Sequence, residues 1–537
     1  MKNKFTKNNN KNKDNRRPSL DIQAELEIVQ ISDVAGSSSG RVVTLMGSVE
    51  RIVQTGGPTV FYIADGTGTL ALKGFEGAGT RAYPEIEEGD VIKATVELGE
   101  YKDELEGEIL KAKKIVGQEH DEYLVMLSEL ERKRAQVTPP QFLIKSHILD
   151  KLKDRFIKAA TEIRLAIIQN RPIIVRHHND TDGYSSGYAL ERAILPLIKK
   201  QHTSEKAAWE FYTRAPCAAP FYDIEDSIRD TSHSLSNAAK FSNKMPLVII
   251  ADNGGGQEDL MGIKQGKVHG LDFIVVDHHY FDADVISSEV LVNINPFLVG
   301  EDGSHYSAGM LCAELGRFIN LVDGMEPIAA MAGLADRIAN PSAIEAYLKL
   351  AHEKGYTKQL LNDIATVIDF ISSKLRFMEA REYIEVLFGE PREQQKKLVA
   401  LMTPYIRNLE AKGLALAKSS AVIETHNKVT LQWLVIDEAF PRGFYPKPGK
   451  CTGILHDNLK ESGTQRIVTI GLMNDAITIR ATDEANFSVH KLLEFLSKEL
   501  PESFVEGGGH KNAGAIKFVP KKKEEIKDLV RKFIKKI

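Results

Sequence analysis

The pattern of hydrophobic and polar positions changes character along the chain. Before residue 120, short β-rich segments separated by Gly and Asp turns occur at 41–53, 59–75, 90–98 and 106–116. From about 120 to 170, apolar residues recur at helical spacing and stop at Pro172. Apolar runs then alternate with helical segments, which predicts an α/β region, and a helical stretch and a second group of strands follow it.

The first group of strands resembles an OB-fold, a small curved β-barrel. The DGTG stretch at 65–68 is a hairpin signal between alternating apolar positions. The resemblance implies a surface that binds oligonucleotides, and the aromatic residues that would stack on bases are Phe61, Tyr62, Phe75 and Tyr101. Strand alternation sends one of Phe61 and Tyr62 inward, so part of this set is expected to fill the barrel instead.

Composition and charge add little to this picture. The 537 residues are 42% hydrophobic and 27% charged with a net charge of −4, which is ordinary for a soluble globular protein of several domains. Residues 1–18 carry seven Lys or Arg against one acid, and residues 517–537 carry nine against three. Each run alone is typical of a solvated tail or helix face, and the Asn-rich, Lys-rich first run is predicted to be disordered.

The cysteine count and the terminal sequence bear on the compartment. Cys217, Cys312 and Cys451 are widely separated, which argues against a disulfide framework or a zinc cluster. No apolar run has membrane-spanning length, and the first residues lack the apolar core of a signal peptide. We therefore expect a cytoplasmic protein without a membrane partner, and the lack of a P-loop pattern predicts no ATP dependence.

Three predicted strands end in acids or histidines. These are PIIV before HHNDTDG (177–183), PLVIIA before DNGG (252–255), and LDFIVV before DHH (277–279). Carboxyl ends of parallel strands meet at one edge of a sheet, where crowded carboxylates require a cation between them. One acid at a strand end is usually a cap or a turn residue, but three successive strand ends favour a metal site. Carboxylates with imidazoles select Mn²⁺ or Mg²⁺ rather than structural zinc.

The ordered series of motifs resembles the DHH phosphoesterases and, within them, the RecJ-like nucleases. Histidine at 178, where bacterial members usually have Asp, is similar to the archaeal variant. The glycine-rich EGGGH stretch at 506–510 resembles the signature of the companion DHHA1 domain. The matching residues are His178, Asp180, Asp182, Gly183, Asp252, Asp277, His278, His279, Asp336, Gly507, Gly508, Gly509 and His510.

The resemblance implies a site for two Mn²⁺ or Mg²⁺ ions that clamp the oxygens of an in-line displacement. One ion would be held by His178 and Asp180, the other by Asp182, His278 and Asp336, with Asp252 bridging both. Catalytic roles would fall to Asp180, Asp182, Asp252, Asp277, His278 and His279.

The same resemblance implies substrate contacts around the ions. His279 would lie toward the scissile phosphate, and Asp277 would orient a histidine. Arg480 and His510 would grip the substrate backbone, and the loop containing Gly508 and Gly509 would bring backbone N–H groups close to a phosphate. The cationic C-terminal segment would border the same site.

The expected organisation combines an α/β fold class with a small β-domain. The predicted parts are a disordered basic arm (1–21), an OB-like nucleic-acid-binding barrel (22–118), linker helices (119–170), a DHH domain with a parallel sheet and a two-metal site (171–340), a helical insert (341–425) and a DHHA1 α/β domain (426–537). In the insert, an apolar face formed by Leu360, Ile364, Val367, Ile368 and Ile371 favours a packed structural role, although partner docking or substrate gating is also found in RecJ-like proteins.

The resemblance implies a metal-dependent exonuclease that hydrolyses single-stranded DNA or RNA in replication, repair or RNA turnover, with replication proteins as further candidate partners. One alternative is a phosphodiesterase for very short oligoribonucleotides or cyclic dinucleotides, which would not need the N-terminal barrel. Another is a non-catalytic replication scaffold, which the complete ligand set disfavours. A pyrophosphatase and a tRNA-editing role fit less well, because GGGH belongs to a different C-terminal domain and no synthetase core is present.

Overall fold

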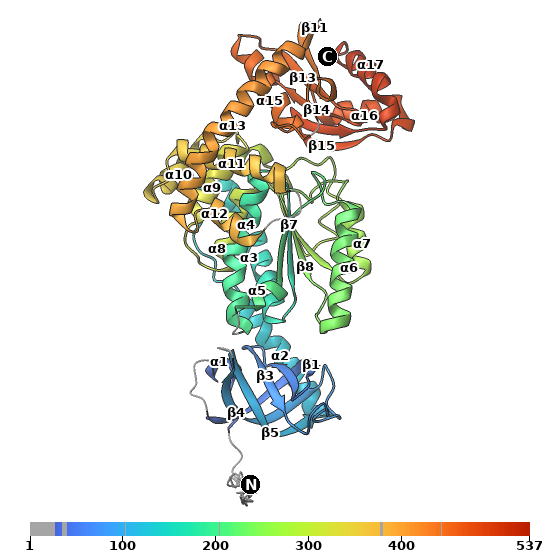
Figure 1. Ribbon diagram of the computed structural model, residues 1–537. Helices are drawn as coiled ribbons and strands as arrows, with labels where there is room; N and C mark the ends of the chain where they lie inside the picture. Colours follow the sequence, from blue (N-terminus) through green and yellow to red (C-terminus); the bar gives the residue numbers. More distant parts are fainter. Residues whose placement is uncertain (1–26, 35–39, 102–103, 203–204, 376–379, 442) are drawn as a thin grey trace, which may run out of the picture. The chain divides into compact units, whose positions relative to one another are not determined.

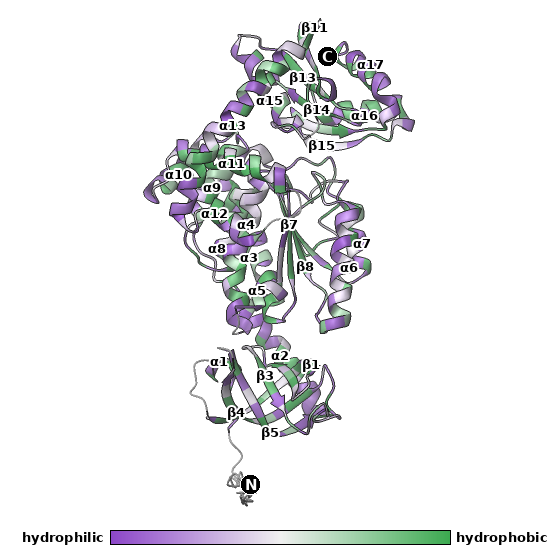
Figure 2. Ribbon diagram, viewed as in Figure 1, coloured by the Kyte–Doolittle hydropathy of each residue, from purple (hydrophilic) through white to green (hydrophobic). Residues whose placement is uncertain are grey.

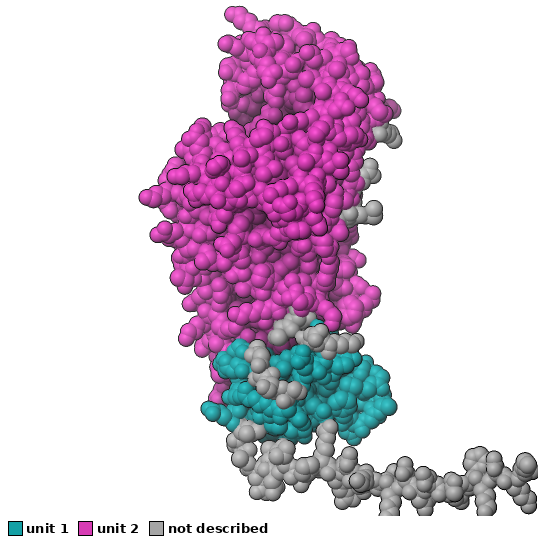
Figure 3. All heavy atoms as spheres, turned by 60° about the vertical axis from the view of Figure 1, so that its left-hand side comes forward, with its two compact units in different colours: residues 1–65, 70–116 teal, residues 66–69, 117–537 magenta. Residues whose placement is uncertain are grey.

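The structure is a computed structural model that describes residues 27–34, 40–101, 104–202, 205–375, 380–441 and 443–537. It divides into two compact units, residues 1–65 with 70–116 and residues 66–69 with 117–537 (Figure 3). The basic arm predicted over 1–21 lies outside the described residues. None of the helices in the described ranges combines the length and the apolar composition that a bilayer crossing requires.

The first unit is a closed barrel with strand order β1-β2-β3-β5-β4 (Figure 1). The long strand β1 pairs with β4 through its first half and with β2 through its second, and a bulge between Val49 and Arg51 bends it so that it can serve both partners. This confirms the predicted OB-like barrel. Its strands are β1 (Val42–Gln54), β2 (Thr59–Ala64), β3 (Thr69–Gly74), β4 (Val91–Tyr101) and β5 (Glu104–Ile115).

The two adjacent aromatics of β2 lie on opposite faces of the barrel wall. Phe61 is fully buried and meets the ring of Tyr83 edge-on at 6.2 Å. Tyr62 is half-buried, and the guanidinium of Arg51 lies over its ring at 4.4 Å. The expectation that Phe61 stacks on bases is therefore wrong, because its side chain fills the barrel core.

The second unit begins with two helices, α2 (Gln118–Ala135) and α3 (His147–Ile168). Half of the residues of α3 are buried, and Leu152 and Phe156 are fully enclosed in the core of the α/β region. The ring of Phe156 packs against those of Phe142 and Phe318, at 5.5 and 5.6 Å, in a cluster of three mutually contacting rings. The expectation of linker helices over 119–170 is therefore wrong for α3, which covers one face of the sheet.

The α/β region contains a parallel sheet with strand order β10-β9-β8-β6-β7. In Figure 1, α6 and α7 lie on one side of this sheet and α3, α4 and α8 on the other. Buried strands covered on both faces explain the continuous apolar runs in the sequence. The strands are β6 (Ile173–His177), β7 (Tyr212–Pro216), β8 (Leu247–Ala251), β9 (Asp272–Val276) and β10 (Val292–Ile294). The helices are α4 (Thr181–His202), α5 (Ala207–Glu210), α6 (Ile224–Phe241), α7 (Leu260–Val268), α8 (Ala308–Ile319) and α9 (Met325–Ala335).

A helical stretch follows, as the apolar periodicity predicts, and within the described residues it contains α10 (Pro341–Glu353), α11 (Lys358–Leu375), α12 (Arg381–Leu387) and α13 (Arg392–Ser420). The predicted apolar face of α11 is buried at Ile364, Val367, Ile368 and Ile371, which share one hydrophobic core with α3 and α4. Leu360 is only partly buried beside them. The helical stretch is therefore packed onto the α/β core.

The C-terminal part is a six-stranded sheet with order β11-β12-β13-β14-β16-β15. Its strands are β11 (Val422–His426), β12 (Val429–Val435), β13 (Ile467–Leu472), β14 (Ala476–Ala481), β15 (Glu506–His510) and β16 (Ala513–Lys517). Its helices are α14 (Ile436–Ala439), α15 (Pro448–Glu461), α16 (Val489–Glu499) and α17 (Lys523–Ile534). Together with the barrel and the parallel sheet, this sheet confirms the predicted mixed α/β class.

The structure corrects one expectation about the C-terminal part and limits another to part of its segment. The GGGH stretch is not a loop but the edge strand β15, in which ideal Cβ atoms at Gly507 and Gly509 would come within 2.2 and 2.5 Å of carbonyl oxygens of β16. The basic helix α17, along which hydrophilic and hydrophobic residues alternate (Figure 2), pairs through Arg531 with Glu424 of β11, at the opposite edge of the sheet. This ion pair places α17 at the β11 edge, whereas Lys517, the first residue of the cationic segment, lies in β16 and pairs with Glu506 of β15.

We expect Phe156→Ala to lower the free energy of unfolding by about 3–5 kcal/mol, because truncation of a buried aromatic leaves a cavity. Urea unfolding followed by circular dichroism measures the effect. Lys153→Ala, an exposed position on the same helix, is the matched control and should stay within about 0.5 kcal/mol of the parent. Equal effects for the two variants would contradict the placement of α3 in the core.

Candidate metal centre and substrate site

The first ligand cluster lies where β6 and β8 end. His178 follows β6 directly, and its Nδ1 lies 3.1 Å from Oδ2 of Asp180 and 3.6 Å from Oδ2 of Asp252. Asp180 is held in place because the backbone N–H of Gly183 donates to its Oδ1 at 3.0 Å. The order in which strands are added to the sheet reverses at β6. The next strand in the chain, β7, lies on one side of β6, and the one after it, β8, lies on the other side. Ligands of open α/β sheets bind at such a point.

The second cluster lies at the end of β9. Nε2 of His278 is 3.9 Å from Oδ2 of Asp182, in the first turn of α4, and 3.7 Å from Oδ2 of Asp336, which caps the C-terminus of α9. The backbone N–H groups of Ala308 and Gly309 donate to the two carboxylate oxygens of Asp182. Each cluster brings its acids and imidazole close enough to hold an ion.

Asp252 faces both clusters. Its Oδ2 points to His178, and its Oδ1 lies 3.4 Å from Nε2 of His278. The residue has a φ of 61°, in the left-handed region that few non-glycine residues adopt, and its N–H donates to Val276 O at 2.9 Å. A strained backbone of this kind persists when the surroundings fix it, and here it directs one carboxylate between the two imidazoles.

The electrostatics of these residues fit a pair of cations. Burial, together with the charges of Asp252 and Asp336, raises the pKa of Asp182 well above its usual value. Burial raises the pKa of Asp336 to about 6, against the opposing effect of His278. Oδ2 of Asp252 and Nε2 of His278 are buried without a hydrogen-bond partner. Carboxylate oxygens are the ligands that suit Mn²⁺ or Mg²⁺, and imidazole nitrogens beside them favour a transition-metal ion such as Mn²⁺.

Asp277 organises the loop that carries the histidines. Its Oδ1 accepts hydrogen bonds from Nδ1 of His279 at 2.8 Å and from the backbone N–H of His278 at 2.8 Å, while its Oδ2 accepts from Gly255 N–H at 2.9 Å. Although burial lowers the pKa of His279, the Asp277 carboxylate raises it above the usual value. Because a carboxylate only accepts, His279 donates through Nδ1 and keeps Nε2 free for another partner.

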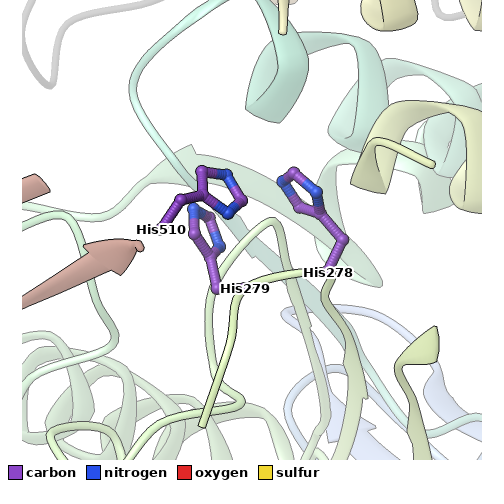
Figure 4. Close-up of side chains that lie close together, drawn as sticks. All are labelled: His278, His279 and His510. Carbon is purple, nitrogen blue, oxygen red and sulfur yellow. The ribbon is translucent and has the colours of Figure 1, made fainter. Parts of the chain in front are cut away.

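His510 of β15 lies against the histidines of the α/β region (Figure 4). Its ring stacks on that of His279 at 4.9 Å and meets that of His278 edge-on at 5.0 Å. Burial and the two neighbouring imidazoles lower the pKa of His510 well below its usual value. The structure therefore brings His279 and His510, which are 231 positions apart in the sequence, to one place beside the second cluster.

Arg480 and His510 lie in the same row of the C-terminal sheet, a row being a line of residues paired across neighbouring strands. Arg480 of β14 pairs with Ala513 of β16, and Ala513 pairs with His510 of β15. Directly opposed residues of antiparallel strands point to the same face, so Arg480 and His510 lie about 10 Å apart on that face. Burial lowers the pKa of Arg480, as does the charge of Arg337.

Two further side chains reach this region without a signal in the sequence. Nζ of Lys447 donates to Asn179 O, in the loop between His178 and Asp180, at 2.9 Å and thereby ties the C-terminal part to the first cluster. The carboxylate of Glu258 lies against the α-carbons of Gly256 and Gly508. The contacts of Lys447 with Asn179 and of Glu258 with Gly508 join residues more than 240 positions apart, a separation over which local periodicity carries no information.

Comparison with known proteins supports both parts of the fold. Residues 43–115 match the family of OB-fold nucleic acid binding domains. The chain is 34% identical over 538 aligned positions to the uncharacterized protein MJ1198 of Methanocaldococcus jannaschii, which covers 94% of this chain and 70% of the relative.

Two solved structures share the α/β architecture. The first is the DHH domain of a member of a ribosomal protein family, with 35% identity, a TM-score of 0.74, and coverage of 78% of this chain and 98% of the other. The second is RecJ of Thermus thermophilus in complex with Mn²⁺, with 17% identity, a TM-score of 0.50, and coverage of 75% and 57%. At that lower identity, the likeness to RecJ concerns the fold.

We expect Mn²⁺ to stabilise the protein against thermal unfolding, by about 2.7 kcal/mol at a free concentration about 100 times the dissociation constant. Asp252→Asn should lose most of this stabilisation, because the amide is neutral and offers one oxygen ligand where the carboxylate offers two. Differential scanning calorimetry with Mn²⁺ and with a chelator measures the difference. Asp272→Asn, which alters a more exposed acid of β9, should respond like the parent, and an undiminished effect in Asp252→Asn would exclude Asp252 as a ligand.

Proposed function

The chain belongs to the DHH/RecJ family of phosphoesterases and carries an N-terminal OB-fold, and from that premise we propose that it is a metal-dependent exonuclease acting on single-stranded DNA or RNA. The observation that carries the proposal is the position of Asp252 between two ligand clusters, with one carboxylate oxygen toward each imidazole. Such an arrangement suits an in-line displacement at phosphorus, where the attacking and the leaving oxygen both need positive charge.

The proposed ligand set divides between the two clusters. His178 and Asp180 would hold one ion, Asp182, His278 and Asp336 the other, and Asp252 would contact both. The chemistry supplied by a bound pair of Mn²⁺ or Mg²⁺ ions is polarisation of the phosphodiester and activation of water. The protein contributes the geometry, because the ends of three buried strands fix the ligands before the substrate arrives.

The proposed substrate contacts come from the α/β region and from the C-terminal sheet. His279, oriented through its hydrogen bond to Asp277, presents Nε2 to the phosphate. His510 is stacked on it, and Arg480, in the same row of the sheet, supplies a cation for the adjoining backbone phosphate. We further propose that the OB barrel binds another part of the same strand, since OB-fold domains bind single strands on one face of their barrel.

The proposed exonuclease is expected to shorten labelled single-stranded oligomers stepwise in Mn²⁺ or Mg²⁺ and to be inactive in a chelator. Asp180→Ala should lower the rate by more than about 100-fold, since even a residue that only orients a ligand costs about 10- to 100-fold. Asp277→Asn should fall within that smaller range, because it weakens the hydrogen bonds that position His279, His278 and Gly255 without removing a proposed ligand.

Gel analysis of DNA and RNA strands of different lengths distinguishes the alternatives, with Asp272→Asn as the control that keeps full activity. Cleavage confined to oligomers of a few nucleotides would favour a small-substrate phosphodiesterase. Absence of metal-dependent cleavage for every strand would overturn the proposal and leave a non-catalytic scaffold.

A further inference from the structure

Glu258 places a carboxylate at the junction of the α/β region and β15. It lies in the loop between β8 and α7, six residues after Asp252. An ideal Cβ at Gly256 would come within 2.6 Å of the Glu258 carboxylate, and one at Gly508 would come within 2.6 Å of its Oε1. A larger residue at either position would displace the Glu258 carboxylate from this place, so two glycines from distant parts of the sequence border one carboxylate.

No Lys or Arg forms an ion pair with this carboxylate among the described residues. Burial raises the pKa of Glu258 and the charge of Asp277 adds to this, while a hydrogen bond from its own backbone N–H and, more weakly, the charge of His279 lower it. An acid that is half-buried without Lys or Arg beside it is costly, so a role in fold stability does not account for it. Its free oxygens remain available to a donor from outside the protein.

Glu258 lies where the end of a bound nucleic-acid strand would reach it. Gly508 and His510 are two residues apart on β15, about 6.6 Å along a strand, and both positions contact the α/β region. If a phosphate lies at His279 and His510, a group one sugar away along the nucleic acid reaches Glu258. A carboxylate there accepts a hydrogen bond from a sugar hydroxyl and repels a phosphate, as acidic residues that bind ribose hydroxyls do in dinucleotide sites.

We propose that Glu258 selects strands whose terminal sugar carries a free hydroxyl and disfavours strands whose end is phosphorylated. The inference rests on the proposed exonuclease function and adds the chemistry of the end that is consumed. The histidines and Arg480 bind the backbone phosphates that every strand contains. Glu258 contacts the terminal group, which is a hydroxyl in some strands and a phosphate in others. It is therefore a specificity-determining residue and not part of the ligand set.

The test uses one oligomer sequence prepared with a hydroxyl or a phosphate at the 5′ end and, separately, at the 3′ end. At whichever end is consumed, the full-length protein should degrade the hydroxyl form at least about tenfold faster in kcat/KM, because a second anion close to a carboxylate costs about 1.4 kcal/mol or more. Glu258→Gln, which keeps the shape and removes the charge, should bring the two rates within about threefold of each other, mainly by accelerating the phosphorylated form.

The outcomes separate this inference from the proposed function. Three results would overturn the role of Glu258 while the exonuclease stands. They are equal rates for the hydroxyl and phosphate forms of the consumed end in the parent protein, faster degradation of the phosphate form, and a hydroxyl preference that Glu258→Gln leaves unchanged. Absence of cleavage of all four oligomers would overturn the exonuclease itself. Glu382→Gln, at an exposed position of α12, is the control for loss of a glutamate charge and should keep the preference of the parent.

Discussion

The structure depends on how buried carboxylates are kept together at the ends of three parallel strands. β6, β8 and β9 are neighbours in the sheet and are buried along almost their whole length, so hydrophobic packing fixes where each strand ends. His178, Asp252 and Asp277 follow these ends directly. Carboxylates forced together in this way are stable only with positive charge between them, and the two imidazoles that flank Asp252 mark where that charge belongs.

The grouping of charged side chains at the strand ends also explains why the C-terminal sheet lies so close to the α/β region. His510 must reach His278 and His279, which requires the edge strand β15 to lie against the loops of the α/β region. Glycines make this possible on both sides of β15: Gly507 and Gly509 allow the close pairing with β16, and Gly508 leaves room for Glu258. Lys447 adds a hydrogen bond to Asn179 O, so the loop of the first cluster is also held from the C-terminal part.

Much of this could be predicted from the sequence, because it depends on local periodicity. The barrel strands, the parallel strands and α11 follow alternation, buried apolar runs and helical spacing, and the acids stood out since each directly follows such a run. The prediction that Phe61 contacts bases was wrong because alternation places Phe61 and Tyr62 on opposite faces of β2 but does not tell which face points into the barrel core. Helix α3 was misjudged because an amphipathic pattern does not say what covers its apolar face, and the GGGH strand because glycine has no preference for strands.

The residues that the sequence did not single out are the ones that join distant segments. Ligands that hold ions and phosphate serve any phosphodiester, so the motifs that contain them do not distinguish one substrate from another. Selection between substrates has to come from side chains that contact other parts of the nucleic acid, and these lie outside the motifs. Glu258 lies next to Gly508 and outside these motifs, and under the proposal its carboxylate responds to the terminal group of a strand and not to the phosphates that all strands share.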